Sequence, residues 1–254
     1  MLSQDLNHWF IGLVFSSTLF IYSLHRVVGL NKLKKDSQKK GRYITIINYK
    51  NHILVYTVIS ILVMVYCLSH MELWTLVLFI PAGIVSTLYT LPVFGEGKRL
   101  RDFNFIKILL IALVWAYVAS VIPMHLMNNS DVPLTILSFS ERFVYLLLIT
   151  LPFDVRDLDI DKSIGVKTLP AALGLSKTKV LIDVLCGLGL VCLLLMYGMH
   201  LIDFKSTLAL ALVYLLSWLA INWAWNKASD YYYSGLLDGL LIVRGLFVLG
   251  STIL

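Results

Sequence analysis

Long apolar runs with few charges, separated by short polar segments, are the dominant pattern along the chain. A helix needs ~20 apolar residues to cross the hydrocarbon core of a bilayer, and each run has about that length. We therefore predict an all-α membrane protein, a polytopic transmembrane helical bundle of about eight spans. The connections are short, so a single integral membrane domain is expected over residues 1–254. The spans are predicted, roughly, at 8–30, 51–69, 72–91, 105–123, 138–157, 179–199, 205–225 and 235–254.

The basic residues are distributed unevenly between the two sides of this predicted bundle. Of 21 lysines and arginines, all but Arg142, Lys205 and Arg244 lie on or beside the segments that follow the odd-numbered helices. Basic residues mark cytoplasmic loops, so this face is predicted to be cytoplasmic, with both termini on the other side. The inner (cytoplasmic) membrane is the expected location. Contact with anionic lipid headgroups accounts for the net charge of +6, and no nucleic-acid partner is expected.

Four aspartates interrupt this pattern directly after the fifth apolar run, in the stretch FDVRDLDIDK at 153–162. If the fifth helix continues through this stretch, a rotation of 100° per residue places Asp154, Asp157 and Asp161 within about 60° of one another. Three carboxylates on one stripe repel one another unless a cation sits among them. Mg²⁺ takes one or two carboxylates together with waters and substrate phosphates, so the three aspartates are candidate metal ligands.

A simpler interpretation is a solvated helix end at which the aspartates only pair with neighbouring basic residues. Two considerations favour a functional role instead. Carboxylates at the C-terminal end of a helix oppose the helix dipole, a cost of ~0.3–1 kcal/mol that requires compensation. Ionisable groups beside the hydrocarbon of a membrane protein also mark functional sites.

The stretch DVRDLDIDKSIGVKTLPAALG at 154–174 resembles the second aspartate motif of the UbiA superfamily of intramembrane prenyltransferases. It is most similar to the 1,4-dihydroxy-2-naphthoate prenyltransferase form, N-x-R-D-x-x-x-D-x-x-x-G-x-[KR]-T. The segment LYTLPVFGEGKRLRDFNFIK at 88–107 resembles a cytoplasmic segment of the same family. The residues in register with the motif are Arg156, Asp157, Asp161, Gly165, Lys167 and Thr168, and Asp154 replaces the amide.

This resemblance implies a helical bundle around a central cavity and a Mg²⁺-dependent reaction. Family members transfer a prenyl group from a polyprenyl diphosphate to an aromatic or other lipophilic acceptor. The resemblance assigns Asp157 and Asp161 as catalytic metal-binding residues, with Asp154 beside them. The candidate diphosphate-binding residues are Lys98, Arg99, Arg101, Lys167, Arg156 and Arg26.

The chain departs from the family at the place of its first aspartate motif. The stretch FIYSLHRVVGLNK at 20–32 contains no acid, and Ser23, His25 and Arg26 stand there instead. Two interpretations follow: His25 and Arg26 contact the diphosphate directly, or the donor site has decayed. Nine helices are typical of the family, so the chain is also expected to lack the first.

Three functions remain open from the sequence. The leading one is the prenyltransferase, and the second is a catalytically idle homologue that binds an isoprenoid lipid or a membrane partner. A transporter is disfavoured because few charges lie at the centre of the predicted spans. Of those few, Asp238 and Arg244 are about 120° apart on one helix, so polar contacts with other helices are expected for them.

Overall fold

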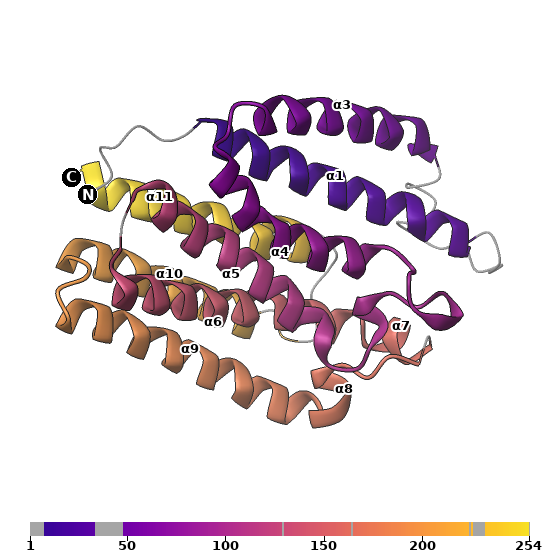
Figure 1. Cartoon of the computed structure of the whole chain (residues 1–254). Coiled ribbons are helices and arrows are strands. Elements are labelled where there is room, and N and C mark those ends of the chain that lie inside the picture. The colour runs from indigo at the N-terminus through magenta and orange to yellow at the C-terminus, as the bar shows by residue number, and fades with distance from the viewer. Residues whose placement is uncertain are drawn as a thin grey trace. The chain divides into compact units, whose positions relative to one another are not determined.

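The computed structural model is all-helical and describes residues 8–33, 48–128, 130–163, 165–223, 225 and 232–253 (Figure 1). Its residues divide into two compact units, one within 3–101 and one within 102–254. The two units are described in turn.

The unit within residues 3–101 contains three long helices, α1 (His8–Leu33), α3 (Lys50–Leu68) and α4 (Leu73–Thr90). Helix α1 packs along α3 and also contacts α4. The approach of α1 to α3 is close, because a Cβ added at Gly12 would lie 2.8 Å from Cys67 Sγ. Large apolar side chains on the other faces are exposed, such as Leu62 on α3 at 65%, as expected for helices that face lipid. Two short 3₁₀ turns, η1 (Gly95–Gly97) and η2 (Leu100–Asp102), follow α4.

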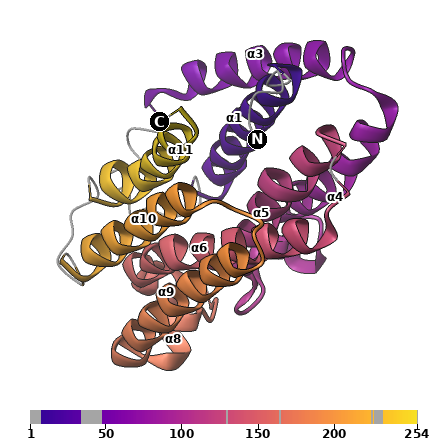
Figure 2. The ribbon, with the colours of Figure 1, turned by 90° about the vertical axis from the view of Figure 1, so that its left-hand side faces the viewer.

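The unit within residues 102–254 is built around one long helix, α6 (Val132–Arg156). Helix α5 (Ile106–Leu126) and helix α9 (Leu175–Gly198) both pack on α6, α10 (Phe204–Trp223) packs on α9, and α11 (Asp238–Ile253) packs on α10. Figure 2 shows α10 between α11 and α9 in this unit. Three shorter elements complete it: α7 (Leu158–Ser163), α8 (Leu169–Leu173) and the π-helix η3 (Tyr232–Leu237).

Two tyrosines occupy the buried centre of this second unit. The rings of Tyr145 on α6 and Tyr214 on α10 meet edge to face at 5.2 Å, and both side chains are buried. The Tyr145 hydroxyl lies 3.1 Å from Ser217 Oγ, and the Tyr214 hydroxyl donates to the Glu141 carbonyl at 3.2 Å. A Cβ at Gly189 of α9 would lie 2.2 Å from the Tyr214 ring. Glycine is therefore required for α9 to approach α10 this closely.

A buried ion pair joins α6 to α11. Arg244 donates to both carboxylate oxygens of Glu141, at 3.0 and 2.6 Å, and its guanidinium lies over the Tyr145 ring at 4.4 Å. Arg142, the next residue of α6, donates to Ser120 Oγ of α5 at 2.9 Å. The expected contact of Arg244 with another helix is confirmed, and its partner is Glu141.

The fold class predicted from the sequence is confirmed. Within the described residues, seven helices are long and apolar enough to cross a membrane: α1 over His8–Val28, α3, α4, α5, α6, α9 and α10. The predicted eighth span corresponds to η3 and α11, which follow each other directly along the chain. Helix α6 begins six residues before its predicted start, because Asp131 caps it by accepting from the Leu134 N–H at 2.9 Å.

Candidate functional site: three aspartates around a lysine

The end of α6 brings three aspartates to one side of the chain. Helix α6 ends at Arg156 and α7 begins at Leu158, with Asp157 between them. The Asp157 N–H donates to the Phe153 carbonyl at 3.0 Å, and the Asp161 N–H donates to the Asp157 carbonyl at 2.9 Å. These two bonds continue the helical course past the end of α6, so the side chains of Asp154, Asp157 and Asp161 stay on one face.

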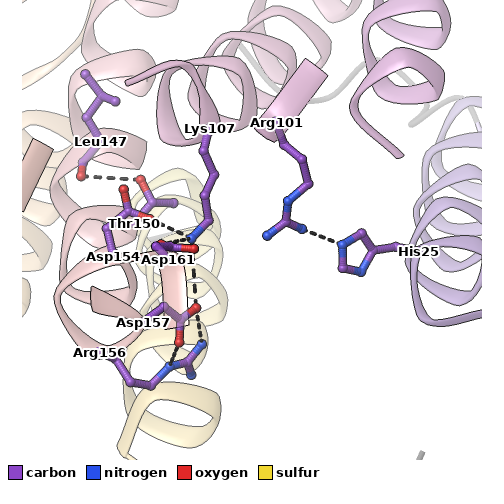
Figure 3. Close-up of polar contacts among 9 residues, drawn as sticks. All are labelled: His25, Arg101, Lys107, Leu147, Thr150, Asp154, Arg156, Asp157 and Asp161. Carbon is purple, nitrogen blue, oxygen red and sulfur yellow. Dashed lines mark hydrogen bonds and ion pairs between the residues drawn. The ribbon is translucent and has the colours of Figure 1, made fainter. Parts of the chain in front are cut away.

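The cation among the three carboxylates is Lys107, in the first turn of α5 (Figure 3). Its Nζ lies 2.9 Å from Asp154 Oδ1, 3.1 Å from Asp161 Oδ2 and 3.9 Å from Asp157 Oδ2. Asp154 and Asp161 are buried, at 2% and 4% exposure, and Lys107 is 9% exposed. Burial strengthens charge pairing, so the ammonium compensates the carboxylate repulsion that the sequence implied.

The backbone around Lys107 is held by the loop that follows α7. Phe105, directly before α5, has a φ of 64°, a left-handed conformation that costs a non-glycine residue of order 1–3 kcal/mol. Its N–H donates to the Lys167 carbonyl at 2.9 Å, and the Lys167 N–H donates to Asn104 Oδ1 at 2.9 Å. The Val166 N–H donates to the Asp161 carbonyl at 2.9 Å. This clamp ties the start of α5 to the aspartates and so fixes where Lys107 points.

Arg156 supplies a second positive charge. It binds Asp157 through two bonds, from Nε to Oδ1 at 2.8 Å and from its terminal nitrogen Nη2 to Oδ2 at 3.2 Å. The guanidinium also lies over the rings of Phe153 and Tyr233, at 5.1 and 5.0 Å. Part of the simpler interpretation therefore holds, because one aspartate pairs with a neighbouring basic residue along the chain.

The charges of this three-aspartate site do not cancel. Three carboxylates face one ammonium and one guanidinium, which leaves a net charge of −1. Carboxylate oxygens are the ligands that Mg²⁺ prefers, so the donor chemistry fits this metal. Their spacing is that of ligands around an ammonium: within the described residues, no three His, Cys, Asp or Glu side chains lie close enough to hold a metal ion together. Mg²⁺ requires oxygens at about 2.0–2.1 Å, so these carboxylates would have to draw closer.

The other residues predicted for this part of the chain lie at the edge of the site. Lys167 is exposed, and in this structure its backbone, rather than its ammonium, contributes to the clamp. Asp159 is also exposed. The Thr168 side chain is buried and opens α8.

The predicted basic residues of the unit within 3–101 gather near the end of α1 and after α4. Arg101 contacts His25 Nε2 through a terminal nitrogen (Figure 3), and its guanidinium lies over the Tyr89 ring at 5.2 Å. Arg26 is exposed, with its guanidinium over the Tyr22 ring at 4.5 Å. Of the remaining pair, Lys98 is exposed and Arg99 is buried. The place of the missing acidic motif is thus occupied by a histidine in contact with an arginine.

Sequence reasoning missed Lys107 as a site residue. It was counted among the basic residues that mark the cytoplasmic face, and nothing local distinguishes it from them. The available signal was electrostatic: three carboxylates on one stripe require a cation, and Lys107 opens an apolar run inside the segment 88–107 that resembles the family.

The fold and the site define a polytopic helical membrane protein with a cluster of three aspartates around a lysine at a helix end. Residues 45–233 match the family model described as the UbiA prenyltransferase family. The chain belongs to this family, and it is an integral, multi-pass membrane protein.

Solved structures show the same fold. A UbiA homolog from Archaeoglobus fulgidus bound to GPP and Mg²⁺ is 13% identical, with a TM-score of 0.67 over 99% of this chain and 88% of that chain. The same homolog bound to DMAPP and Mg²⁺ is 14% identical, with a TM-score of 0.66 and the same coverage. A structure of digeranylgeranylglyceryl phosphate synthase is 15% identical, with a TM-score of 0.59 over 97% of this chain and 85% of that chain. No curated protein sequence matched the chain.

Proposed function

We propose that this protein transfers a prenyl group from a polyprenyl diphosphate to an aromatic or other lipophilic acceptor, within the membrane and with Mg²⁺. The observation that carries this proposal is the convergence of Asp154, Asp157 and Asp161 on one cation position in a chain of this family. The Archaeoglobus homolog is bound to prenyl diphosphates and Mg²⁺, which supports the same ligand class for this chain. We further propose that the site faces the cytoplasm, because the basic residues gather on that side of the predicted topology.

The three aspartates would hold the metal, and the chain's cations would bind the diphosphate. When bound, Mg²⁺ would neutralise negative charge that develops on the leaving diphosphate. Arg156 holds Asp157 in position through two hydrogen bonds. Lys167 is exposed beside the site, where its ammonium is available to phosphate oxygens. A reactive allylic group requires that water be excluded, and the buried apolar residues Leu148 and Leu151 precede the aspartates on α6.

A second function is favoured by one observation. His25 stands where the family's first acidic motif is expected, and it contacts Arg101. A protein that keeps one acidic cluster and lacks the other retains diphosphate affinity without a complete donor site. The alternative is therefore a catalytically idle homologue that binds an isoprenoid lipid or a membrane partner.

The test is binding of a non-hydrolysable prenyl diphosphate analogue to purified protein in detergent, with Mg²⁺ and with a chelator. We expect Asp157→Asn and Asp161→Asn to weaken binding by at least about 10-fold, the scale on which metal-site substitutions act. Asp159→Asn is the matched control, because it removes the same charge from the same stretch at an exposed position, and it should bind like the wild type. Equal binding by all four proteins, independent of Mg²⁺, would reject the proposed site.

Transfer must then be measured with radiolabelled donor and a panel of lipophilic acceptors. Product that depends on Asp157 and Asp161 supports the enzyme. Mg²⁺-dependent donor binding without product from any acceptor favours the idle homologue.

A further inference from the structure

The position of Lys107 affects how Mg²⁺ would bind to the three aspartates. We propose that Lys107 is a built-in cation that holds the three aspartates in the metal-free protein and gives up this place when Mg²⁺ binds. This inference rests on the proposed function, because it requires that the aspartates bind a divalent metal at all.

Geometry makes the lysine and the metal mutually exclusive. Lys107 Nζ is within 3.1 Å of oxygens from both Asp154 and Asp161 and within 3.9 Å of Asp157. Mg²⁺ bound to those same oxygens would contact them at about 2.0–2.1 Å. A metal at this distance from the same oxygens leaves no room for the ammonium among them, and the two cations would also repel each other.

Charge makes the exchange favourable. With Lys107 in place, the three carboxylates, the ammonium and Arg156 sum to −1. With Mg²⁺ in place of the ammonium, the three carboxylates, the metal and Arg156 sum to zero. The cluster is largely buried, where a residual charge is costly. Among these five side chains, metal binding therefore removes the charge that the lysine alone leaves.

The backbone allows the lysine to leave without unfolding its helix. Lys107 lies in the first turn of α5, and the clamp that fixes this turn is made by Phe105 and Asn104. The lysine side chain forms none of the clamp's hydrogen bonds. Its four-carbon stem can therefore move by rotamer change, and the released ammonium is then available to the diphosphate.

The first measurement needs only the wild-type protein and Mg²⁺. Amine acylation of each lysine, quantified by mass spectrometry, should be low at Lys107 without metal, because that side chain is buried and bound to carboxylates. Saturating Mg²⁺ should raise labelling of Lys107 several-fold and leave exposed Lys177 unchanged. Unchanged Lys107 labelling at saturating metal would overturn the exchange.

The second measurement is Mn²⁺ binding by electron paramagnetic resonance, with no prenyl diphosphate present. Lys107→Met removes the competing cation and should tighten Mn²⁺ binding by about 10-fold, the lower end of the range for groups that contact metal ligands. Lys107→Arg keeps the charge and should not tighten it. Lys162→Met removes one exposed positive charge from α7. It is the control for a change in Mn²⁺ binding that comes only from losing a positive charge near the site.

The outcomes separate the two proposals. If wild type and Lys107→Met bind Mn²⁺ equally, the metal site stands and the exchange is rejected. If neither binds Mn²⁺, both the metal-dependent function and the exchange are rejected. If Lys107→Met does not fold, the labelling experiment on the wild type still decides.

Discussion

The ion pair between Glu141 and Arg244 allows a quantitative test of what holds the second unit together. The two side chains share two hydrogen bonds, at 3.0 and 2.6 Å, and are 4% and 14% exposed. Two unit charges at 4 Å attract by roughly 4 kcal/mol at an effective dielectric constant of 20, and desolvation offsets much of this gain. Removing one partner is different, because it leaves the other charge buried without compensation, at a cost of about 3–5 kcal/mol.

The perturbation is a cycle of Glu141→Leu, Arg244→Leu and the double variant. Each single change should lower the thermal midpoint in detergent by roughly 6–20 °C, from 3–5 kcal/mol at 2–4 °C per kcal/mol. The thermal midpoint of the double variant should fall by clearly less than the sum of the two single losses, because no unpaired Glu141 or Arg244 charge then remains. Scans at one fixed rate are compared, since membrane proteins often unfold irreversibly. Lys177→Gln, at an exposed position, is the control, with an expected change within about 0.5 kcal/mol.

The cycle also has a clear negative result. If the losses of the two single variants simply add in the double variant, Glu141 and Arg244 do not stabilise each other. The link between α6 and α11 would then rest on apolar packing and on the hydrogen bond from the Tyr145 hydroxyl to the Leu240 carbonyl at 3.5 Å.

Two further predictions concern the same unit. Gly189→Ala should destabilise the protein by ~1–3 kcal/mol, because the added Cβ would lie 2.2 Å from the buried Tyr214 ring. Thermal unfolding in detergent measures this loss. An unchanged thermal midpoint would refute the close approach of α9 to α10. Asp203, directly before α10, accepts from the Ser206 N–H at 3.3 Å, so Asp203→Ala should cost ~0.5–2 kcal/mol as a lost cap. Donation by the Ser206 hydroxyl, and then by the Ser206 N–H, lowers the pKa of Asp203. The stabilisation of the folded protein by the ionised Asp203 carboxylate is present above the unfolded pKa of this carboxyl. It is lost as the pH falls through the lower folded pKa. The difference in stability between the wild type and Asp203→Ala should therefore shrink in acid, and a difference that grows in acid would contradict the capping role.

The long helices were predictable because the bilayer imposes a length on them. Seven of the predicted spans correspond to helices with nearby bounds, and the eighth corresponds to η3 and α11. The short helices α7 and α8 were not predicted. They have six and five residues, which is too few for a hydrophobic period, and their positions depend on contacts such as the Val166 N–H to the Asp161 carbonyl.

The candidate site was predictable in its acidic half only. The convergence of Asp154, Asp157 and Asp161 followed from helical periodicity, which is local. Lys107 lies 54 positions before Asp161 along the chain, and its role depends on how α5 packs on α6. Glu141 was missed for the same reason, because a single acid in an apolar run has no identifiable partner until Arg244 of α11 is placed beside it.

The two buried charge clusters on α6 differ in a way that separates structure from function. Glu141 and Asp154 lie ~20 Å apart along the helix at 1.5 Å per residue. Both oxygens of Glu141 accept from one arginine, so its charge and its hydrogen-bonding capacity are met within the protein. At the other end, three carboxylates share one lysine and one arginine. Asp154 Oδ1 contacts Lys107 Nζ at 2.9 Å but accepts no hydrogen bond of normal geometry. A cluster with more acceptors than donors, and with net negative charge among these five side chains, is the feature on which the proposed metal site at the end of α6 rests.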